Sequence, residues 1–137
     1  MKNLSRILIT LLAVLGIGTG CSSVKNAAVG GSIEVVTPQE FKSRLQADKA
    51  ACLLDVRRPE EFSAGHLAGA HPLNWLDSTT FDNGAKRLDK SKTLYVYCRS
   101  GHRSNLAAHH LAAHGFKVVD MKGGYLAWTA SGLEVEK

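Results

Sequence analysis

Short β-prone runs alternate with helical patterns along the chain, and this alternation limits the fold more than any other feature. The runs that favour strands lie at 33–36, 53–56, 93–97 and 117–121. Helical patterns lie at 38–48, 103–114 and 125–131, with a short helical turn that begins near residue 58. Strands that alternate with helices pair in parallel and are covered by helices on both faces. The sequence therefore predicts an α/β domain with a mostly parallel central sheet flanked by helices.

Two segments fit this scheme less regularly. We expect residues 69–74 to lie extended at the edge of the sheet, because Pro72 cannot donate a ladder hydrogen bond. The stretch 75–88 is less periodic, and Asp82-Asn83-Gly84 predicts a turn that interrupts its helix.

The helical patterns also indicate which side chains form the core. The helix at 38–48 is expected to begin with a capping box from Thr37 to Glu40. In the helix at 103–114, we expect Leu106, Ala107, Leu111 and Ala112 to face the sheet, with Gly115 as a left-handed cap. Trp128 of the final helix is expected to pack on the core.

The first 20 residues have the pattern of an export signal. Lys2 and Arg6 precede eleven largely apolar residues at 7–17, a stretch shorter than the ~20 residues that a transmembrane helix needs. The sequence therefore predicts a signal peptide at 1–20, a flexible tether at 21–32 and a single domain at 33–137.

Gly18-Thr19-Gly20-Cys21 resembles the lipobox of bacterial lipoproteins, in which the Cys is lipidated, although a large aliphatic residue usually stands where Gly18 is found. This resemblance implies a lipid anchor on Cys21 that attaches the protein to a membrane. It implies the periplasmic face of a bacterial envelope, and Ser22 after the Cys is typical of lipoproteins of the outer membrane. Secretion as a soluble periplasmic protein remains the alternative.

The charge of the chain is mildly basic. The formal net charge is +5, and removal of Lys2 and Arg6 leaves 15 basic and 12 acidic residues. This excess is too small and too dispersed to indicate nucleic-acid binding. It fits a small anionic substrate better.

The three cysteines do not indicate a disulfide framework. If the strands at 53–56 and 93–97 lie in parallel, Cys52 is about 13 Å from Cys98 along the sheet. A disulfide requires Cα atoms within ~7 Å, so we expect no bridge between them.

Cys98 lies at the point where the strand at 93–97 ends. It opens the sequence Cys98-Arg99-Ser100-Gly101-His102-Arg103-Ser104, after which a helical pattern begins. Unpaired N–H groups and the dipole of a helix N-terminus stabilise an anion held in such a loop. We therefore expect Cys98 to be in part a thiolate near neutral pH, with Arg99 and Arg103 reinforcing the effect. A buried strand Cys followed by a solvated basic turn is the alternative.

Three motifs in this order resemble those of single-domain rhodaneses, which are sulfurtransferase modules. The first is Leu54-Asp55-Val56-Arg57 with Pro59-Glu60-Glu61-Phe62 and Gly65-His66-Leu67-Ala68-Gly69-Ala70, the second is the Cys98 loop, and the third is Gly123-Gly124-Tyr125-Leu126-Ala127-Trp128. The resemblance implies a three-layer rhodanese-like fold. It also implies that Cys98 carries sulfur as a persulfide, from thiosulfate or a similar small donor to cyanide or a thiol, a protein thiol included, without a cofactor.

The resemblance implies a role for each residue of the loop. The substrate would be bound by Arg99, Ser100, Gly101, His102, Arg103 and Ser104, with the backbone N–H groups stabilising the persulfide. The arginines Arg99 and Arg103 would orient a dianionic donor. Asp55 resembles the structural acidic residue that pairs with a nearby Arg, which would be Arg57.

Phosphatase or arsenate reductase activity, noncatalytic binding and metal binding are alternatives to sulfur transfer. Cys-dependent phosphatases and arsenate reductases that share this fold place an Arg six positions after the Cys, whereas Arg103 follows Cys98 by five, a shorter loop that crowds out a phosphoryl group. A noncatalytic binding or sensing module remains an alternative. The pair His110 and His114 lies at a spacing of four without an HExxH pattern, so a metal site is not indicated.

Overall fold

The computed structural model describes residues 30–137. The expectations for the signal peptide at 1–20, for Cys21 and for most of the tether concern residues outside that range. Within it the strands are β1 (Ser32–Val36), β2 (Cys52–Asp55), β3 (His71–Pro72), β4 (Thr93–Tyr97) and β5 (Lys117–Met121). The helices are α2 (Pro38–Ala47), α3 (Pro59–Ala64), α4 (Ser78–Ala85), α5 (His102–Ala113) and α6 (Gly124–Ala130). No helix among these is long and apolar enough to cross a membrane.

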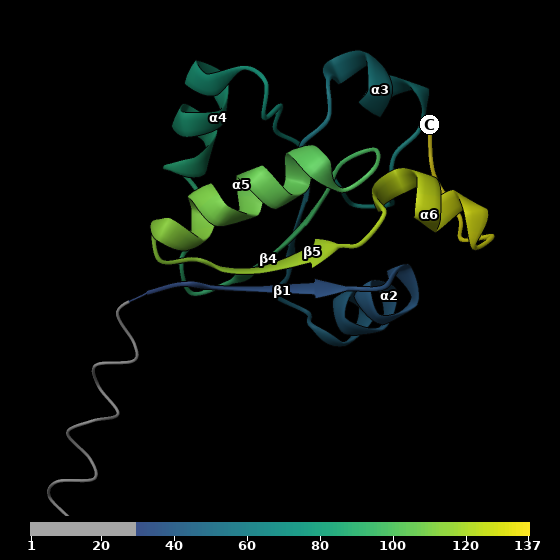
Figure 1. The fold of residues 1–137 in the computed structure, drawn as a ribbon, viewed down its shortest axis with the longest axis horizontal. Helices are drawn as coiled ribbons and strands as arrows, with labels where there is room; N and C mark the ends of the chain where they lie inside the picture. Colours follow the sequence, from purple (N-terminus) through teal and green to yellow (C-terminus); the bar gives the residue numbers. More distant parts are fainter. Residues whose placement is uncertain (1–29) are drawn as a thin grey trace, which may run out of the picture.

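The sheet has the strand order β1-β5-β4-β2-β3, and every pairing is parallel. The short strand β3 lies at an edge, as Pro72 predicts. Because the strands are parallel, their carboxyl ends share one edge, where the chain turns into α3, α5 and α6 (Figure 1). The predicted α/β fold is confirmed, and the strands at 93–97 and 117–121 have the predicted bounds.

The first strand begins at Ser32, inside the segment that we expected to be tether. The N–H of Gly31 donates to the Ala112 carbonyl at 3.2 Å, which fixes the start of β1 beside the end of α5.

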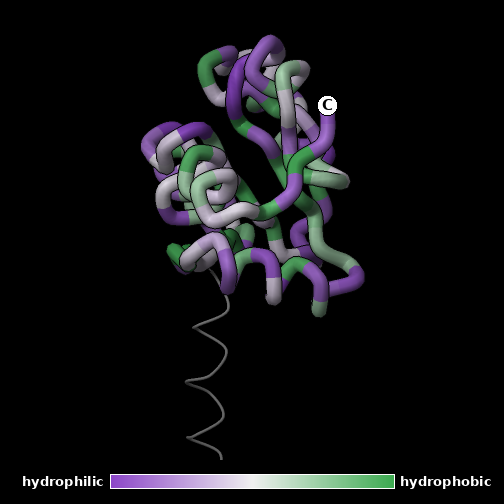
Figure 2. The backbone as a smooth tube through the Cα atoms, turned by 90° about the vertical axis from the view of Figure 1, so that its right-hand side faces the viewer, coloured by the Kyte–Doolittle hydropathy of each residue, from purple (hydrophilic) through white to green (hydrophobic). Residues whose placement is uncertain are grey.

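Each face of the sheet packs on its own core, so the molecule has three layers. On one face, Leu54 and Val96 pack with Phe81 of α4 and Leu111 of α5. On the other face, the core around Phe41 and Trp128 belongs to α2 and α6. Burial of both faces explains the continuous apolar strands. Hydrophilic residues predominate in the outer turns of the backbone (Figure 2).

The predicted capping box of α2 is half formed. The N–H of Glu40 donates to Thr37 Oγ1 at 3.2 Å. The Glu40 carboxylate instead accepts from Arg44 Nη2 at 3.0 Å, one turn further along the helix.

Two local predictions are wrong. The turn expected at Asp82-Asn83-Gly84 lies inside the continuous helix α4, which begins after the N-cap Asp77 and is anchored by the buried Phe81. Gly84 packs against Leu73, and a Cβ at this position would require Leu73 Cδ1 to shift. Leu106 of α5 is 44% exposed instead of facing the sheet, and Ala108 is buried in its place.

Candidate active site

Cys98 lies immediately after β4, the middle strand of the sheet, and its side chain is 0% exposed. The N–H of Gly101 donates to Cys98 Sγ at 3.1 Å. Gly101 has a φ of 103° and is the N-cap of α5, so the chain turns sharply and its amide points back at the sulfur. This contact is the amide-to-sulfur interaction that the sequence predicts for an anion-binding loop.

The loop is attached to the first turn of α6. The Tyr125 N–H donates to the Cys98 carbonyl at 2.8 Å, and the Leu126 N–H donates to the Arg99 carbonyl at 3.0 Å. Gly124 makes this close approach possible. A Cβ on Gly124 would lie 2.5 Å from the Cys98 oxygen and 2.6 Å from the Arg99 oxygen.

Gly124→Ala is therefore expected to destabilise the fold and to change the reactivity of Cys98. Gly132→Ala is the matched control. Gly132 has a φ of +78° and open space around the position that a Cβ would take, whereas Gly124 has a φ of +58° and a crowded position. Both variants incur about 1–2 kcal/mol for a left-handed Ala. Only Gly124→Ala adds the overlap with the loop. Thermal unfolding and the rate of iodoacetamide alkylation of Cys98 would measure this, and equal effects in the two variants would contradict it.

A buried ion pair lies next to the loop. The Asp55 side chain is 0% exposed and that of Arg57 is 4% exposed. Arg57 Nη2 donates to Asp55 Oδ2 at 2.7 Å, and its Nε donates to Oδ1 at 2.9 Å. The Arg57 N–H also donates to Asp55 Oδ1, at 3.0 Å. Asp55 thus pairs with Arg57, as the resemblance implies.

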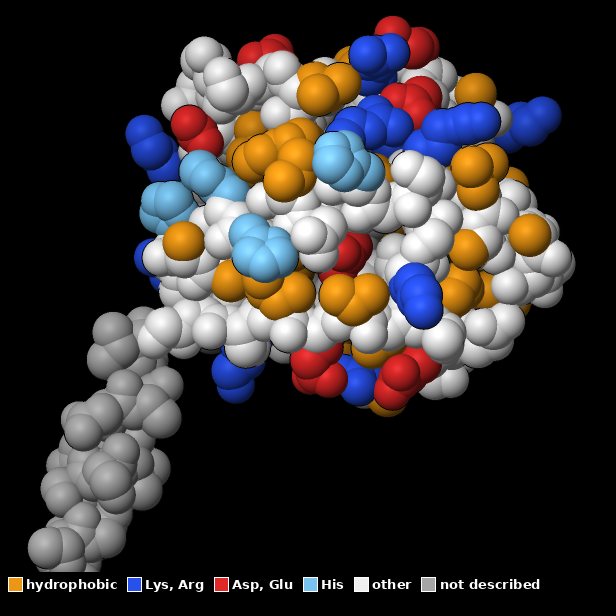
Figure 3. Space-filling view, in the orientation of Figure 1, with side chains coloured by type: hydrophobic (Ala, Val, Ile, Leu, Met, Phe, Trp, Pro, Cys, Tyr) orange, Lys and Arg blue, Asp and Glu red, His pale blue; other side chains and the backbone are white. Residues whose placement is uncertain are grey.

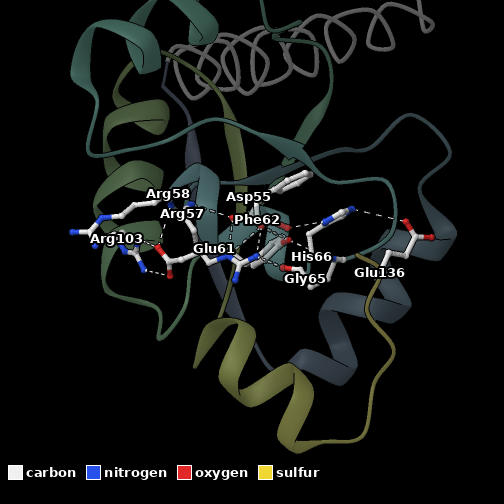
Figure 4. Close-up of polar contacts among 11 residues, drawn as sticks. Asp55, Arg57, Arg58, Glu61, Phe62, Gly65, His66, Arg103 and Glu136 are labelled. Atoms are coloured by element: carbon white, nitrogen blue, oxygen red, sulfur yellow. Dashed lines mark hydrogen bonds and ion pairs between the residues drawn. The ribbon is translucent and has the colours of Figure 1, made fainter.

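Other groups contact this ion pair, and Figure 4 shows Arg57 between Asp55 and Gly65. Arg57 Nη2 donates to the Gly65 carbonyl at 2.6 Å, and the guanidinium lies 4.3 Å from the centre of the Tyr125 ring. The Tyr97 hydroxyl donates to Asp55 Oδ2 at 2.6 Å and accepts from the Leu67 N–H at 3.1 Å. Burial, with the Asp55 charge adding to it, raises the pKa of Tyr97, so this phenol remains a donor at neutral pH.

Arg103 is paired with a carboxylate and is not a free cation. Its Nη1 donates to Glu61 Oε1 at 2.7 Å, and its Nη2 donates to Glu61 Oε2 at 3.0 Å. These hydrogen bonds lower the pKa of Glu61 to about 2, so the carboxylate is ionised at neutral pH. Arg99 is exposed, and no ion pair of Arg99 is found within residues 30–137. Arg99 and Arg103 are both expected to bind a donor, but among the described residues only the charge of Arg103 is already balanced by a carboxylate.

The remaining loop residues divide into an outer and an inner group. Ser100 and His102 are exposed. Ser104 is buried, and its hydroxyl donates to the Gly101 carbonyl at 3.4 Å, so it supports the loop from inside. Basic side chains gather where α3 and the start of α5 lie, with acidic side chains among them (Figure 3).

Other titratable groups lie apart from the loop. Cys52 is half-buried, and burial raises the pKa of its thiol. Within residues 30–137, neither Cys52 nor Cys98 forms a disulfide. His110 packs against Trp75 and Phe81, and its Nε2 lies 3.2 Å from Asp82 Oδ1. In the described part of the chain, no three His, Cys, Asp or Glu residues form a group that could hold a metal ion.

Several residues of this site are not evident from the sequence alone. The sequence does not indicate that Glu61 is the partner of Arg103, and it identifies Tyr97 only as part of a strand. The backbone of Tyr125 and Leu126 holds the loop, a role that their motif does not indicate. The signal for all of these is the order of the three motifs, which places their residues on one edge of the sheet.

A family model described as "Rhodanese-like domain" matches residues 37–131. The chain is 33% identical over 96 residues to the sulfurtransferase-named YtwF of Bacillus subtilis, with 70% of this chain and 90% of that protein covered. It is 32% identical over 95 residues to a thiosulfate sulfurtransferase, GlpE, of Pseudomonas putida, with 69% of this chain and 84% of GlpE covered.

Solved structures show the same architecture. The crystal structure of a rhodanese-related protein from Thermoplasma volcanium superposes with a TM-score of 0.67 and 26% sequence identity. The match covers 75% of this chain and 97% of the other. The three-layer arrangement around Cys98 is therefore similar to that of a known protein across almost its whole length.

Proposed function

The chain belongs to the rhodanese-like domain family, and from this premise we propose that it is a sulfurtransferase that works through a persulfide on Cys98. The donor is thiosulfate or a similar small molecule with a transferable sulfur. The acceptor is cyanide or a thiol, which includes a thiol on another protein. The contact between the Gly101 N–H and Cys98 Sγ, at 3.1 Å, carries this proposal.

The reaction proceeds in two half-reactions. The Cys98 thiolate attacks the outer sulfur of thiosulfate, the sulfur–sulfur bond of the donor breaks, and sulfite leaves with the bonding electron pair. The acceptor then attacks the terminal sulfur of the persulfide, and the Cys98 thiolate is the leaving group. A covalent intermediate shared by two half-reactions gives ping-pong kinetics.

The surroundings of Cys98 support each half-reaction. The Gly101 N–H already donates to Cys98 Sγ. A preorganised donor of this kind stabilises negative charge on the sulfur without having to rearrange during the reaction. The exposed Arg99 can attract an anionic donor. The apolar neighbours of Cys98 in the core between the sheet and α5 exclude water behind the sulfur, which limits hydrolysis of the persulfide.

Steady-state kinetics test the two-step scheme. We measure thiocyanate formation while thiosulfate is varied at several fixed cyanide concentrations. Parallel double-reciprocal lines are expected, because the sulfur is first transferred to the enzyme. Lines that converge would show that both substrates must bind together, which contradicts a persulfide intermediate.

We also propose that the protein is a lipoprotein of the bacterial cell envelope, attached through Cys21. The apolar stretch at 7–17 and the sequence Gly18-Thr19-Gly20-Cys21 support this location.

The anchor can be tested in cells. Cys21→Ala should remove the protein from the membrane fraction, because the lipid of a lipoprotein is attached to the thiol of the lipobox Cys. Ser22→Ala is the matched control and should stay with the membranes. If Cys21→Ala fractionates as wild type does, the lipid anchor is refuted.

A further inference from the structure

The contact between Glu61 and Arg103 has the geometry with which an arginine binds a substrate anion. Two guanidinium nitrogens of Arg103 donate to the two carboxylate oxygens of Glu61, at 2.7 and 3.0 Å. Arg binds the oxygens of sulfonates, phosphates and carboxylates with this same two-pronged geometry. Glu61 therefore occupies the edge of the guanidinium that an oxyanion of a sulfur donor would use.

Glu61 is held in this position from its own helix. It is the third residue of α3, and the Arg58 N–H donates to Glu61 Oε1 at 3.2 Å. The side chains of Arg103 and Glu61 are 18% and 23% exposed, so the pair is open to solvent on one side and partly shielded from screening. The hydrogen bonds that Arg103 donates to the Glu61 carboxylate raise the pKa of Arg103, so the guanidinium stays charged within the pair.

We propose that Glu61 determines the charge of the donor that this site prefers. It neutralises Arg103 and leaves Arg99 as the exposed arginine of the Cys98 loop. The site is then suited to donors with a single negative charge, such as organic persulfides and thiosulfonates, more than to the thiosulfate dianion. This inference rests on the proposed sulfurtransferase function and names the substrate class of the same site.

A purely structural role for Glu61 predicts a different result. If Glu61 only holds Arg103 in place, its loss disturbs the loop and slows all donors alike. If it sets the charge of the site, its loss frees Arg103 and favours the dianion in particular. The ratio of the rates with two donors of different charge separates these roles.

The two donors are thiosulfate and benzenethiosulfonate, with cyanide as the acceptor of both. In both molecules the outer sulfur is attacked, and sulfite or benzenesulfinate leaves. The donors differ by one negative charge and by the phenyl ring that replaces an oxygen, and the effect of the ring cancels when the ratio is compared between variants. We compare kcat/KM for each donor in wild type, Glu61→Gln and Glu60→Gln. Glu60→Gln is the control, because it removes an exposed carboxylate from the same helical turn.

Glu61→Gln should raise the ratio of kcat/KM for thiosulfate over benzenethiosulfonate about tenfold, mainly through KM, since one unpaired charge near the substrate acts at this scale. Glu60→Gln should change the ratio much less. The double variant Glu61→Gln with Arg103→Gln removes both charges and should return the ratio toward that of wild type. An unchanged ratio in Glu61→Gln, or an equal fall with both donors, would overturn the inference.

A binding measurement separates this inference from the proposed function. Sulfate is an unreactive dianion, and its binding beside Arg99 and Arg103 should slow alkylation of Cys98 by iodoacetamide at constant ionic strength. Glu61→Gln should need about a tenth of the sulfate that wild type needs for half protection. Absence of turnover with both donors in wild type would refute the proposed function, whereas equal protection of wild type and Glu61→Gln would refute the role of Glu61.

Discussion

Cys98→Ser will lower thiocyanate formation from thiosulfate and cyanide to the background rate, a loss on the order of a thousandfold or more. The hydroxyl has nearly the shape of the thiol, and the Gly101 N–H can still donate to it, so the loop should keep its geometry. A serine cannot form a persulfide, because a persulfide requires a sulfur–sulfur bond. The expected loss therefore reports the chemistry of the sulfur and not the packing around it.

Cys52→Ser provides the matched control for this variant. Cys52 is half-buried at the start of β2, at the end of the sheet opposite to Cys98. Its replacement should leave kcat/KM for thiosulfate near the wild-type value. Activity that survives in Cys98→Ser but disappears in Cys52→Ser would show that the sulfur is carried at the opposite end of the sheet.

Asp55→Ala is expected to have the largest effect on stability. It leaves the Arg57 guanidinium, which is 4% exposed, without its carboxylate partner, and it removes the acceptor of the Tyr97 hydroxyl. Breaking a buried ion pair in this way costs about 3–5 kcal/mol. For a domain of this size, the midpoint of thermal unfolding should fall by on the order of 20 °C.

Two further variants show that the unpaired charge causes this loss. Asp55→Leu combined with Arg57→Met removes both charges and should recover a large part of the stability, because apolar side chains can replace a buried ion pair. Arg44→Ala breaks ion pairs with Glu34 and Glu40 at the exposed surface and should leave the midpoint near that of wild type. A double variant that is as unstable as Asp55→Ala would contradict this explanation.

The sequence predicts the sheet well because its strands are buried on both faces. Such strands are recognised by apolar content alone, and those at 93–97 and 117–121 have the predicted bounds. The helices are less predictable where tertiary contacts determine whether a segment is helical. Asp82-Asn83-Gly84 has turn chemistry, but Phe81 is buried and Gly84 packs closely against Leu73, so the helix continues.

In the candidate site, the sequence predicts contacts between residues of the same motif. It does not predict contacts between residues of two different motifs. Asp55 and Arg57 are two residues apart, and their pairing follows from a single motif. The contacts of Arg103 with Glu61 and of Tyr97 with Asp55 each join residues 42 positions apart. Both arise because parallel strands bring separate loops to one edge of the sheet, which residue types alone do not reveal. For the same reason the sequence does not indicate that Arg103 is paired with Glu61 while Arg99 is exposed.

Mass spectrometry of the protein after incubation with thiosulfate tests the central claim most directly. We predict that the peptide containing Cys98 gains the mass of one sulfur atom, and that cyanide removes this sulfur as thiocyanate in an equal amount. The peptide containing Cys52 should remain unmodified. Cys98 that stays unmodified while thiocyanate is formed, or added sulfur found on Cys52 alone, would contradict a persulfide carried on Cys98.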